Sequence, residues 1–214
     1  TKFAPGLKQI EDAREIRARF LMAFELAEVA DSEDERRKLL TFVLVGGGPT
    51  GVEMAGAMAE VARQTLRSDF RQIDPGNAHI ILIEAGPRIL PSLPDHLSLY
   101  TKHVLERMGV QVRAATKVTD CDEHGVMLES GERIDASTIV WAAGVRASPA
   151  ADWIGAEADR VGRILVGTDL SVPGFSNLFA IGDLAAVKEQ SGNPVPGVAP
   201  AAKQMGRYIG RHIE

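Results

Sequence analysis

The chain has 214 residues, of which 45% are hydrophobic and 25% charged, a balance typical of a folded globular protein. This composition excludes wholesale disorder, a collagen-like repeat and a small scaffold held by disulfides. The 24 basic and 29 acidic residues give a formal net charge of −5, so we expect no nucleic-acid partner. The single cysteine, Cys121, allows neither an internal disulfide nor a redox-active cysteine pair.

The first 38 residues are predicted to be helical. Apolar residues recur at steps of three and four over residues 8–30, which indicates an amphipathic helix. The charge-rich residues 31–38 are expected to form a solvated turn and a short helix.

Strands and helices then alternate up to residue 144. Three short apolar runs predict strands at Thr41–Val45, His79–Ile83 and Thr138–Trp141, and Val110–Arg113 resembles a further strand. Helical spacing predicts helices over 52–66 and 95–108, the second ending at Gly109. Short alternating runs over 117–134 predict an antiparallel meander. The sequence therefore predicts an α/β fold, with a Rossmann-like parallel sheet and an antiparallel meander insert.

The composition changes after Val145. Residues 163–166 and 178–181 are predicted to be short strands in a stretch rich in glycine and proline. Residues 191–200 read as a loop and residues 201–213 as a closing helix.

The strongest local motif is the glycine loop that follows the first strand. Gly46, Gly48 and Gly51 have the spacing of a dinucleotide fingerprint, in the required context of a strand before and a helix after. The first glycine makes the turn, the second lets backbone approach a pyrophosphate, and the third lets helix and strand pack closely. Pro49 suits the helix start, and we include Gly47 and Thr50 in the predicted site.

An acid at the end of the next strand completes the predicted site. Glu84 stands there, and a carboxylate accepts hydrogen bonds from the ribose hydroxyls but repels a 2′-phosphate. We therefore predict NADH rather than NADPH as the ligand. Arg88 instead favours NADPH, because an arginine can bind the 2′-phosphate.

Six segments resemble the type II NADH dehydrogenases, which are NADH:quinone oxidoreductases of the two-dinucleotide-binding-domain flavoprotein superfamily. They are EDAREIRARFLMAFELAE (11–28), TFVLVGGGPTGVEMAGAMA (41–59), IEAGPRILP (83–91), WAAGV (141–145), NLFAIGD (177–183) and VAPAAKQMGRYIGRHI (198–213). The resemblance covers nearly the whole chain and keeps the order of the family motifs.

The resemblance implies roles for further residues. Glu53 at the first helical turn, with Ala143 and Gly144, would lie near the nicotinamide. Gly182 and Asp183 would bind the ribityl chain of FAD, and the helix that carries Ala199 and Gln204 would point its start at the flavin ring. No residue is expected to act as a general acid or base, because hydride passes from nicotinamide to flavin and the protein positions the two groups.

The resemblance also implies a division of the chain. Residues 1–38 would be a helical lead-in on the FAD-domain side, residues 39–144 the NADH-binding domain, and residues 145–214 an incomplete second segment of the FAD-binding domain. The sequence has one such glycine loop, so we expect that the first half of the FAD domain and the membrane-docking C-terminal region are missing. The isolated chain is then expected to bind FAD weakly or not at all and to be inactive alone.

The expected activity of the intact protein is transfer of hydride from NADH to FAD and of electrons to a membrane quinone, at the cytoplasmic face of the inner membrane. We also expect the intact protein to form a homodimer and to contact the membrane peripherally. Many family members have Ala-Gln where this chain has Ala199-Pro200, which weakens the case for quinone. Two alternatives remain open: an FAD-dependent NADH reductase of a ferredoxin- or rubredoxin-type carrier, and a non-catalytic NADH-binding module. The five histidines lack metal-ligand spacing, so we expect no metal.

Overall fold

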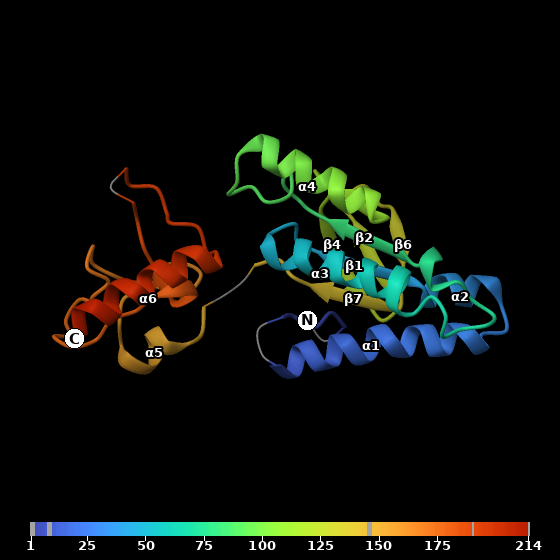
Figure 1. Ribbon diagram of the computed structural model, residues 1–214, viewed down its shortest axis with the longest axis horizontal. Helices are drawn as coiled ribbons and strands as arrows, with labels where there is room; N and C mark the ends of the chain where they lie inside the picture. The colour runs from blue at the N-terminus through green and yellow to red at the C-terminus, as the bar shows by residue number, and fades with distance from the viewer. Residues whose placement is uncertain (1–2, 8–9, 145–146, 190, 214) are drawn as a thin grey trace. The chain divides into compact units, whose positions relative to one another are not determined.

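The computed structural model describes residues 3–7, 10–144, 147–189 and 191–213. The chain divides into two compact units, Thr1–Ala143 and Gly144–Glu214, which we call unit 1 and unit 2 (Figure 1). The assignment of residues 39–144 to an NADH-binding domain and of residues 145–214 to part of an FAD-binding domain stays a prediction.

A four-stranded parallel sheet with the order β3-β2-β1-β7 forms the centre of unit 1. Its strands have the predicted bounds: β1 (Thr41–Val45), β2 (His79–Ile83), β3 (Val110–Arg113) and β7 (Thr138–Trp141). Alternate residues of β1 enter two different core clusters, Phe42 and Leu44 one and Val43 and Val45 the other. Burial on both faces explains why β1 reads as an uninterrupted apolar run.

Helices cover one face of this sheet. They are α1 (Ile10–Val29), α3 (Pro49–Glu60) and α4 (Asp95–Arg107), and all three contribute to the core cluster that contains Phe42. The rings of Phe20, Phe24 and Phe42 lie 4.8–5.5 Å apart between centroids. The predicted helix near the N-terminus is therefore confirmed over its described residues, and it packs on the sheet of unit 1. The assignment of residues 1–38 to the FAD-domain side of a longer protein stays a prediction.

Short elements connect the layers. In the charged segment, α2 (Glu33–Leu39) begins after Ser32, whose Oγ accepts a hydrogen bond from the backbone N–H of Glu35. This serine is a favourable N-cap. A 3-10 turn at Pro75–Asn77 precedes β2.

The helix after β1 begins three residues earlier than predicted. Gly48 is its N-cap and Pro49 its first residue, because proline has the φ of a helix and the first turn needs no N–H from it. After Glu60 the chain continues as a π-helix, Val61–Thr65. The earlier start places Glu53 beyond the first helical turn, which corrects the predicted position of that acid.

The meander forms the third layer of unit 1. It consists of β4 (Val118–Asp122), β5 (Gly125–Leu128) and β6 (Arg133–Asp135), paired antiparallel in that order. Val126, Leu128 and Ile134 join the core cluster on the sheet face opposite the helices. The predicted insert and its topology are confirmed.

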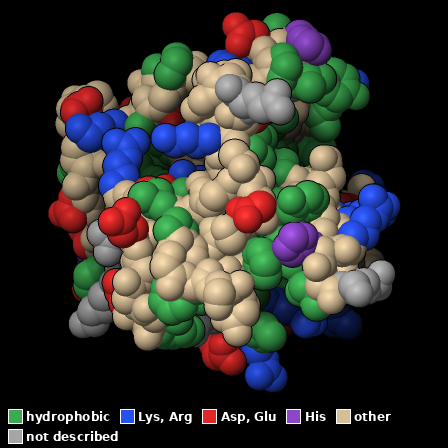
Figure 2. Space-filling view, turned by 90° about the vertical axis from the view of Figure 1, so that its left-hand side faces the viewer, with side chains coloured by type: hydrophobic (Ala, Val, Ile, Leu, Met, Phe, Trp, Pro, Cys, Tyr) green, Lys and Arg blue, Asp and Glu red, His purple; other side chains and the backbone are tan. Residues whose placement is uncertain are grey.

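Unit 2 is built from short elements around a small core. They are α5 (Ala150–Ile154), β8 (Ile164–Leu165), a 3-10 turn (Gly182–Leu184), β9 (Ala185–Ala186) and α6 (Ala199–Ile213). β8 pairs parallel with β9. Figure 2 shows hydrophobic, basic and acidic side chains interspersed on the face of the chain that it draws.

Two predictions for unit 2 are wrong in detail. Residues 178–181 form no strand: Phe179 makes a single bridge to Ser171, and Ala180 donates its N–H to the carbonyl of Leu170. The apolar character of this segment reflects burial, as at Ala180, and not membership of a β-sheet. The last helix begins at Ala199 rather than at residue 201. None of the helices formed by the described residues combines the length and hydrophobicity that crossing a membrane requires.

Candidate functional site

The turn after β1 is tight and can be made only by glycine. Gly46 has φ +114° and donates its N–H to the carbonyl of Ile83, at the end of β2, at 2.8 Å. A β-carbon at Gly46 would lie 2.6 Å from the backbone nitrogen of Ala143. The first glycine therefore brings together the carboxyl ends of β1, β2 and β7, where ligands bind in open α/β sheets.

Gly51 lets α3 pack against that turn. A β-carbon at Gly51 would lie 1.9 Å from the carbonyl oxygen of Gly46, closer than two such atoms can approach. The side of α3 that carries Gly51 is consequently in direct contact with the loop. This contact is the one expected of the third glycine in a dinucleotide fingerprint.

Gly48 differs from the other two glycines because the space around it is open. A β-carbon built there would meet no atom within 4 Å, and Gly48 caps the start of α3. The first turn of α3, which includes Pro49 and Thr50, contains no acidic residue. The unpaired N–H groups and the positive end of the helix dipole are therefore available to an anionic ligand.

Glu84 fixes the opposite side of the loop. Its Oε2 accepts the N–H of Gly47 at 2.6 Å, and its Oε1 accepts the N–H of Gly86 at 2.7 Å. Because an ionised carboxylate has about four lone-pair sites, these two bonds leave acceptor capacity for ribose hydroxyls. The predicted acid thus lies beside the predicted glycine loop, and its orientation is set by backbone donors.

Arg88 is held by the loop that follows Glu84. Its Nη1 donates to the carbonyl of Leu93 at 2.7 Å, and its Nη2 donates to that of Pro91 at 3.0 Å. Nη1 also lies 3.1 Å from Oδ1 of Asp95. These contacts engage the guanidinium within its own loop.

The remaining predicted residues of unit 1 lie at the edge of this site or away from it. Ala143 borders Gly46, as described, and Ala142 before it donates its N–H to the carbonyl of Val45 at 2.8 Å. Gly144, at the start of unit 2, has φ +67°. Glu53 is exposed in α3, so its position alone assigns it no role.

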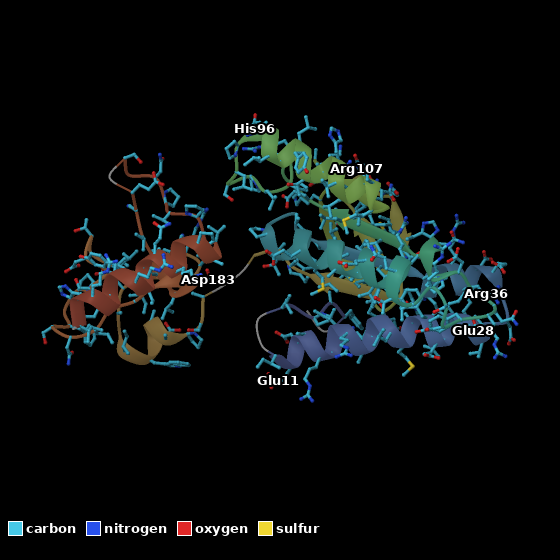
Figure 3. All side chains as sticks on the ribbon, in the orientation of Figure 1. Glu11, Glu28, Arg36, His96, Arg107 and Asp183 are labelled. Carbon is cyan, nitrogen blue, oxygen red and sulfur yellow. The ribbon has the colours of Figure 1, made fainter. Side chains whose placement is uncertain are left out.

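In unit 2 the predicted flavin-side residues Gly182 and Asp183 contact α6 and the segment before it, but not the predicted residues Ala199 and Gln204. Gly182 has φ +63° and donates its N–H to Sδ of Met205 on α6 at 3.2 Å. A β-carbon at Gly197, just before α6, would lie 3.5 Å from Oδ1 of Asp183 (labelled in Figure 3). Ala199 is the exposed first residue of α6. Gln204 instead lines a cavity of about 450 Å³ with four other side chains of that helix.

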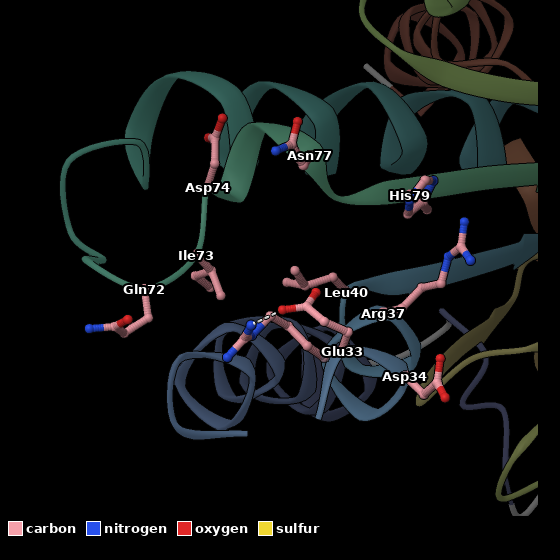
Figure 4. A pocket seen from close by; sticks show the side chains of 10 residues that line it. Glu33, Asp34, Arg37, Leu40, Gln72, Ile73, Asp74, Asn77 and His79 are labelled. Carbon is pink, nitrogen blue, oxygen red and sulfur yellow. Dashed lines mark hydrogen bonds and ion pairs between the residues drawn. The ribbon is translucent and has the colours of Figure 1, made fainter. Parts of the chain in front are cut away.

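Two other cavities of unit 1 are lined neither by the glycine loop nor by Glu84. One, of about 380 Å³, lies between α2 and the segment before β2, with Arg37, Asp74 and His79 on its wall (Figure 4). The other, of about 850 Å³, extends from α2 to β3 and β6. Charged groups around it pair with one another, as Arg113 does with Glu132 at 2.6 Å. Neither cavity includes the glycine turn, the start of α3 or Glu84, which are the features that a dinucleotide site requires.

Glu28 ties α1 to the segment that borders the smaller cavity (Figure 3). Its carboxylate accepts the backbone N–H groups of Arg71, Gln72 and Ile73 at 2.9–3.2 Å. Desolvation raises the pKa of Glu28, but the three donors and the nearby charge of Arg36 together lower it by more. The net pKa is therefore below the usual value. This carboxylate stabilises the fold. Among the residues that the structure describes, no group of three His, Cys, Asp or Glu side chains could hold a metal ion.

Comparisons with known proteins agree with this geometry. A family model described as pyridine nucleotide-disulphide oxidoreductase matches residues 4–206. The type II NADH:quinone oxidoreductase Ndh of Mycobacterium tuberculosis is 43% identical, with 100% of this chain and 47% of the relative covered. The type II NADH:quinone oxidoreductase NdhA of the same organism is 46% identical, over 96% of this chain and 45% of the relative. The chain therefore spans about half the length of the curated relatives it matches.

A solved structure gives the same result for the fold. NDH2 from Plasmodium falciparum in complex with NADH superposes with a TM-score of 0.73 at 26% identity, over 87% of this chain and 40% of that chain. The resemblance to type II NADH dehydrogenases and the α/β fold class are thus confirmed.

Proposed function

The chain belongs to the pyridine nucleotide-disulphide oxidoreductase family, and on that premise we propose that it is the NADH-binding portion of an FAD-dependent NADH:quinone oxidoreductase. The relatives named above as type II NADH:quinone oxidoreductases support this function, as does the NADH complex of the Plasmodium falciparum protein. The single cysteine argues against a dithiol mechanism within the chain, despite the family name.

One observation carries the proposal: an open Gly48 at the start of α3 lies in the same loop as Gly47, which Glu84 holds. The pyrophosphate would bind at the helix start, where N–H groups and the helix dipole favour negative charge. The adenosine ribose would bind Glu84 through its hydroxyls. Ala143 and Gly144, after β7, would border the nicotinamide end, and Glu53 would contribute at the second turn of α3.

Two features favour NADH over NADPH. The Glu84 carboxylate would face the 2′-phosphate of NADPH, and juxtaposed like charges cost several kcal/mol. Arg88, the residue that could offset this repulsion, already donates to the carbonyls of Pro91 and Leu93. These bonds use two of the five N–H donors of the guanidinium and hold it against its own loop.

Unit 2 supplies the proposed flavin side. Gly182 has a positive φ, a conformation that glycine adopts where the backbone approaches a ligand closely. Asp183 follows it in the 3-10 turn. We propose that these residues bind the ribityl chain, with Ala199 and Gln204 on the flavin-facing helix. FAD, when bound, accepts hydride from NADH and supplies electrons to a quinone. We further propose that the intact protein is a homodimer that contacts the cytoplasmic face of the inner membrane peripherally.

Calorimetric titration of the 214-residue chain with NADH and NADPH tests the nucleotide site. We expect NADH to bind more tightly than NADPH, and Glu84→Arg to weaken NADH binding at least about tenfold, equivalent to ~1.4 kcal/mol. Glu60→Arg, a charge reversal at an exposed residue of α3, is the matched control and should bind NADH as the wild type does. A preference for NADPH, or equal effects of the two variants, would contradict the assignment of Glu84.

The electron acceptor is tested with the full-length protein. NADH oxidation supported by a soluble quinone analogue, and not by a ferredoxin or rubredoxin, is the expected result. The reverse pattern would identify a reductase of a small electron carrier instead.

A further inference from the structure

Residues 88–98 run from the loop after β2 into the first turn of α4, and we call this segment, which contacts the glycine loop, the strap. Its contact with the loop is specific: the N–H of Leu90 donates to the carbonyl of Gly47 at 2.7 Å. The N–H of the same Gly47 donates to Glu84 at 2.6 Å, so Gly47 is held at both its amide and its carbonyl.

We propose that the strap positions the glycine loop for dinucleotide binding, with Ser98 and Arg88 as positioning residues that act through Leu90 and Gly47. The inference rests on the proposed function, because it assumes that the loop binds NADH. It concerns residues that touch neither the pyrophosphate nor the ribose in that assignment.

The backbone of the strap is strained at the point of contact. Leu90 has φ +48°, in the left-handed region that bulky residues rarely adopt, and its side chain is buried. Such a conformation persists only where the surroundings over-determine it. Neighbouring residues must therefore restrain Leu90 in this conformation.

Ser98, in the first turn of α4, is one such restraint. Its hydroxyl donates to the carbonyl of Ile89 at 2.6 Å, and Ser98 is one of only a few buried polar residues in the described part of the chain. The side chain of Ile89 is buried against the loop: a β-carbon at Gly47 would lie 2.8 Å from its Cγ2. Ser98 thus fixes Ile89, which packs on Gly47. Ile89 directly precedes Leu90, which bonds to Gly47.

Arg88 is the second restraint. Its guanidinium bridges the carbonyls of Pro91 and Leu93, on the turn closed by the N–H of Leu93 and the carbonyl of Leu90 at 2.9 Å. Its ion pair with Asp95 is weaker, because the Asp95 side chain is 91% exposed. Arg88 and Ser98 therefore act on the two sides of Leu90.

Displacement of Gly47 would disturb both halves of the proposed site at once. Gly48 follows Gly47 directly, so the orientation of one peptide affects the start of α3. Glu84 bonds to the N–H of Gly47, so its carboxylate loses a fixed partner when the loop moves. Preorganisation of this kind lowers the ordering cost of binding.

The test compares two variants with two matched controls in the 214-residue chain. Ser98→Ala removes the hydroxyl that bonds to Ile89, whereas Thr101→Ala removes a hydroxyl of the same helix that bonds only to Leu97. Arg88→Ala removes the guanidinium on the strap. Arg107→Ala removes an exposed cation from the end of α4, which controls for the lost positive charge because NADH is an anion.

We expect about tenfold weaker NADH binding for Ser98→Ala and a smaller loss for Arg88→Ala, with both controls unchanged. Amide exchange followed by NMR should accelerate at Gly47 and Leu90 while the amides of Val43 and Leu44 in β1 keep their protection. Ser98→Thr, which retains the hydroxyl, should restore both readouts. If Ser98→Ala does not fold, the proposal is tested by comparing the NADH affinity of Arg88→Ala with that of Arg107→Ala.

The outcomes separate the two claims. A wild-type chain that does not bind NADH overturns the proposed function and the role of the strap with it. A wild-type chain that binds NADH, together with strap variants that bind as tightly as their controls, overturns the strap alone. General loss of protection throughout β1 would also overturn it, because Ser98 and Arg88 would then only stabilise the fold.

Discussion

The two ends of the parallel sheet differ in how they present polar groups. At the carboxyl end, the glycine loop offers open backbone at Gly48 and one carboxylate, Glu84, which backbone donors orient. At the amino end, charged side chains line a cavity of about 380 Å³ and the start of a second cavity, of about 850 Å³, which extends along the sheet to Arg113 at the end of β3. Several of these are paired with each other, as Arg133 is with Asp135 at 3.0 Å.

The difference shows that cavity volume alone does not identify the site in this fold. A dinucleotide is recognised by backbone N–H groups, a helix start and a single acid, and these features occupy little volume. The charged walls of the amino end instead satisfy one another. We therefore expect substitutions at the carboxyl end to change binding, and those at the amino end to change stability or nothing.

The largest effect is expected for Gly51→Ala. The added β-carbon would overlap the carbonyl oxygen of Gly46, so the helix and the loop must separate, at a cost of about 1–3 kcal/mol or more. NADH affinity should fall by at least an order of magnitude in the same variant. Gly56→Ala on the same helix is the control: its β-carbon would lie 3.8 Å from Leu105 Cδ2, and the alanine should stabilise the helix by up to about 1 kcal/mol. Equal melting temperatures for the two variants would refute the contact.

An intermediate effect, on stability and its pH dependence, is expected for Asp122→Asn in the meander. Hydrogen bonds from the Arg133 guanidinium and from the backbone of His124 lower the pKa of Asp122 from 3.8 to about 2. A lowered native pKa means that the carboxylate stabilises the fold above its unfolded-state pKa, and that this stabilisation is lost as pH falls toward 2.

The wild type should therefore melt at a higher temperature than Asp122→Asn at neutral pH, and the gap should close between about pH 4 and pH 2. Thermal melts at several pH values measure this gap. Its persistence at pH 2, or a change in NADH affinity at pH 7, would contradict the role of this carboxylate.

The smallest effect is expected for Arg37→Ala. Arg37 lines both amino-end cavities. A single exposed charge at that end is largely screened from the glycine loop at physiological salt. NADH affinity, measured by calorimetry, should stay within about twofold of the wild type. A tenfold loss would mean that the ligand reaches the amino end, and the distinction between the two ends would fail.

Much of unit 1 could be predicted from the sequence, because β1, β2 and β7 are largely buried and read as short apolar runs. The glycine loop and Glu84 could be predicted for the same reason, since each directly follows such a strand. The start of α3 was missed: Pro49 continues the helix toward the loop, whereas apolar spacing becomes visible only from Val52. The predicted position of Glu53 was wrong as a consequence.

Other features depend on contacts between distant residues. The bond from Gly47 to Glu84 spans 37 residues, and the burial of Ser98 depends on how α4 packs. Residues 178–181 misled the prediction because an apolar run indicates burial without indicating a strand partner. In unit 2, where strands have two residues each, periodicity has too few repeats to be informative.

The most direct test of the central claim is an NMR titration of the isotope-labelled 214-residue chain with NADH. We predict that the amide resonances of the loop glycines, Thr50, Glu84 and Ala143 shift in a saturable way, while those of Arg37, Asp74 and His79 stay in place. Shifts concentrated at the amino-end residues, with the glycine loop unaffected, would contradict the account.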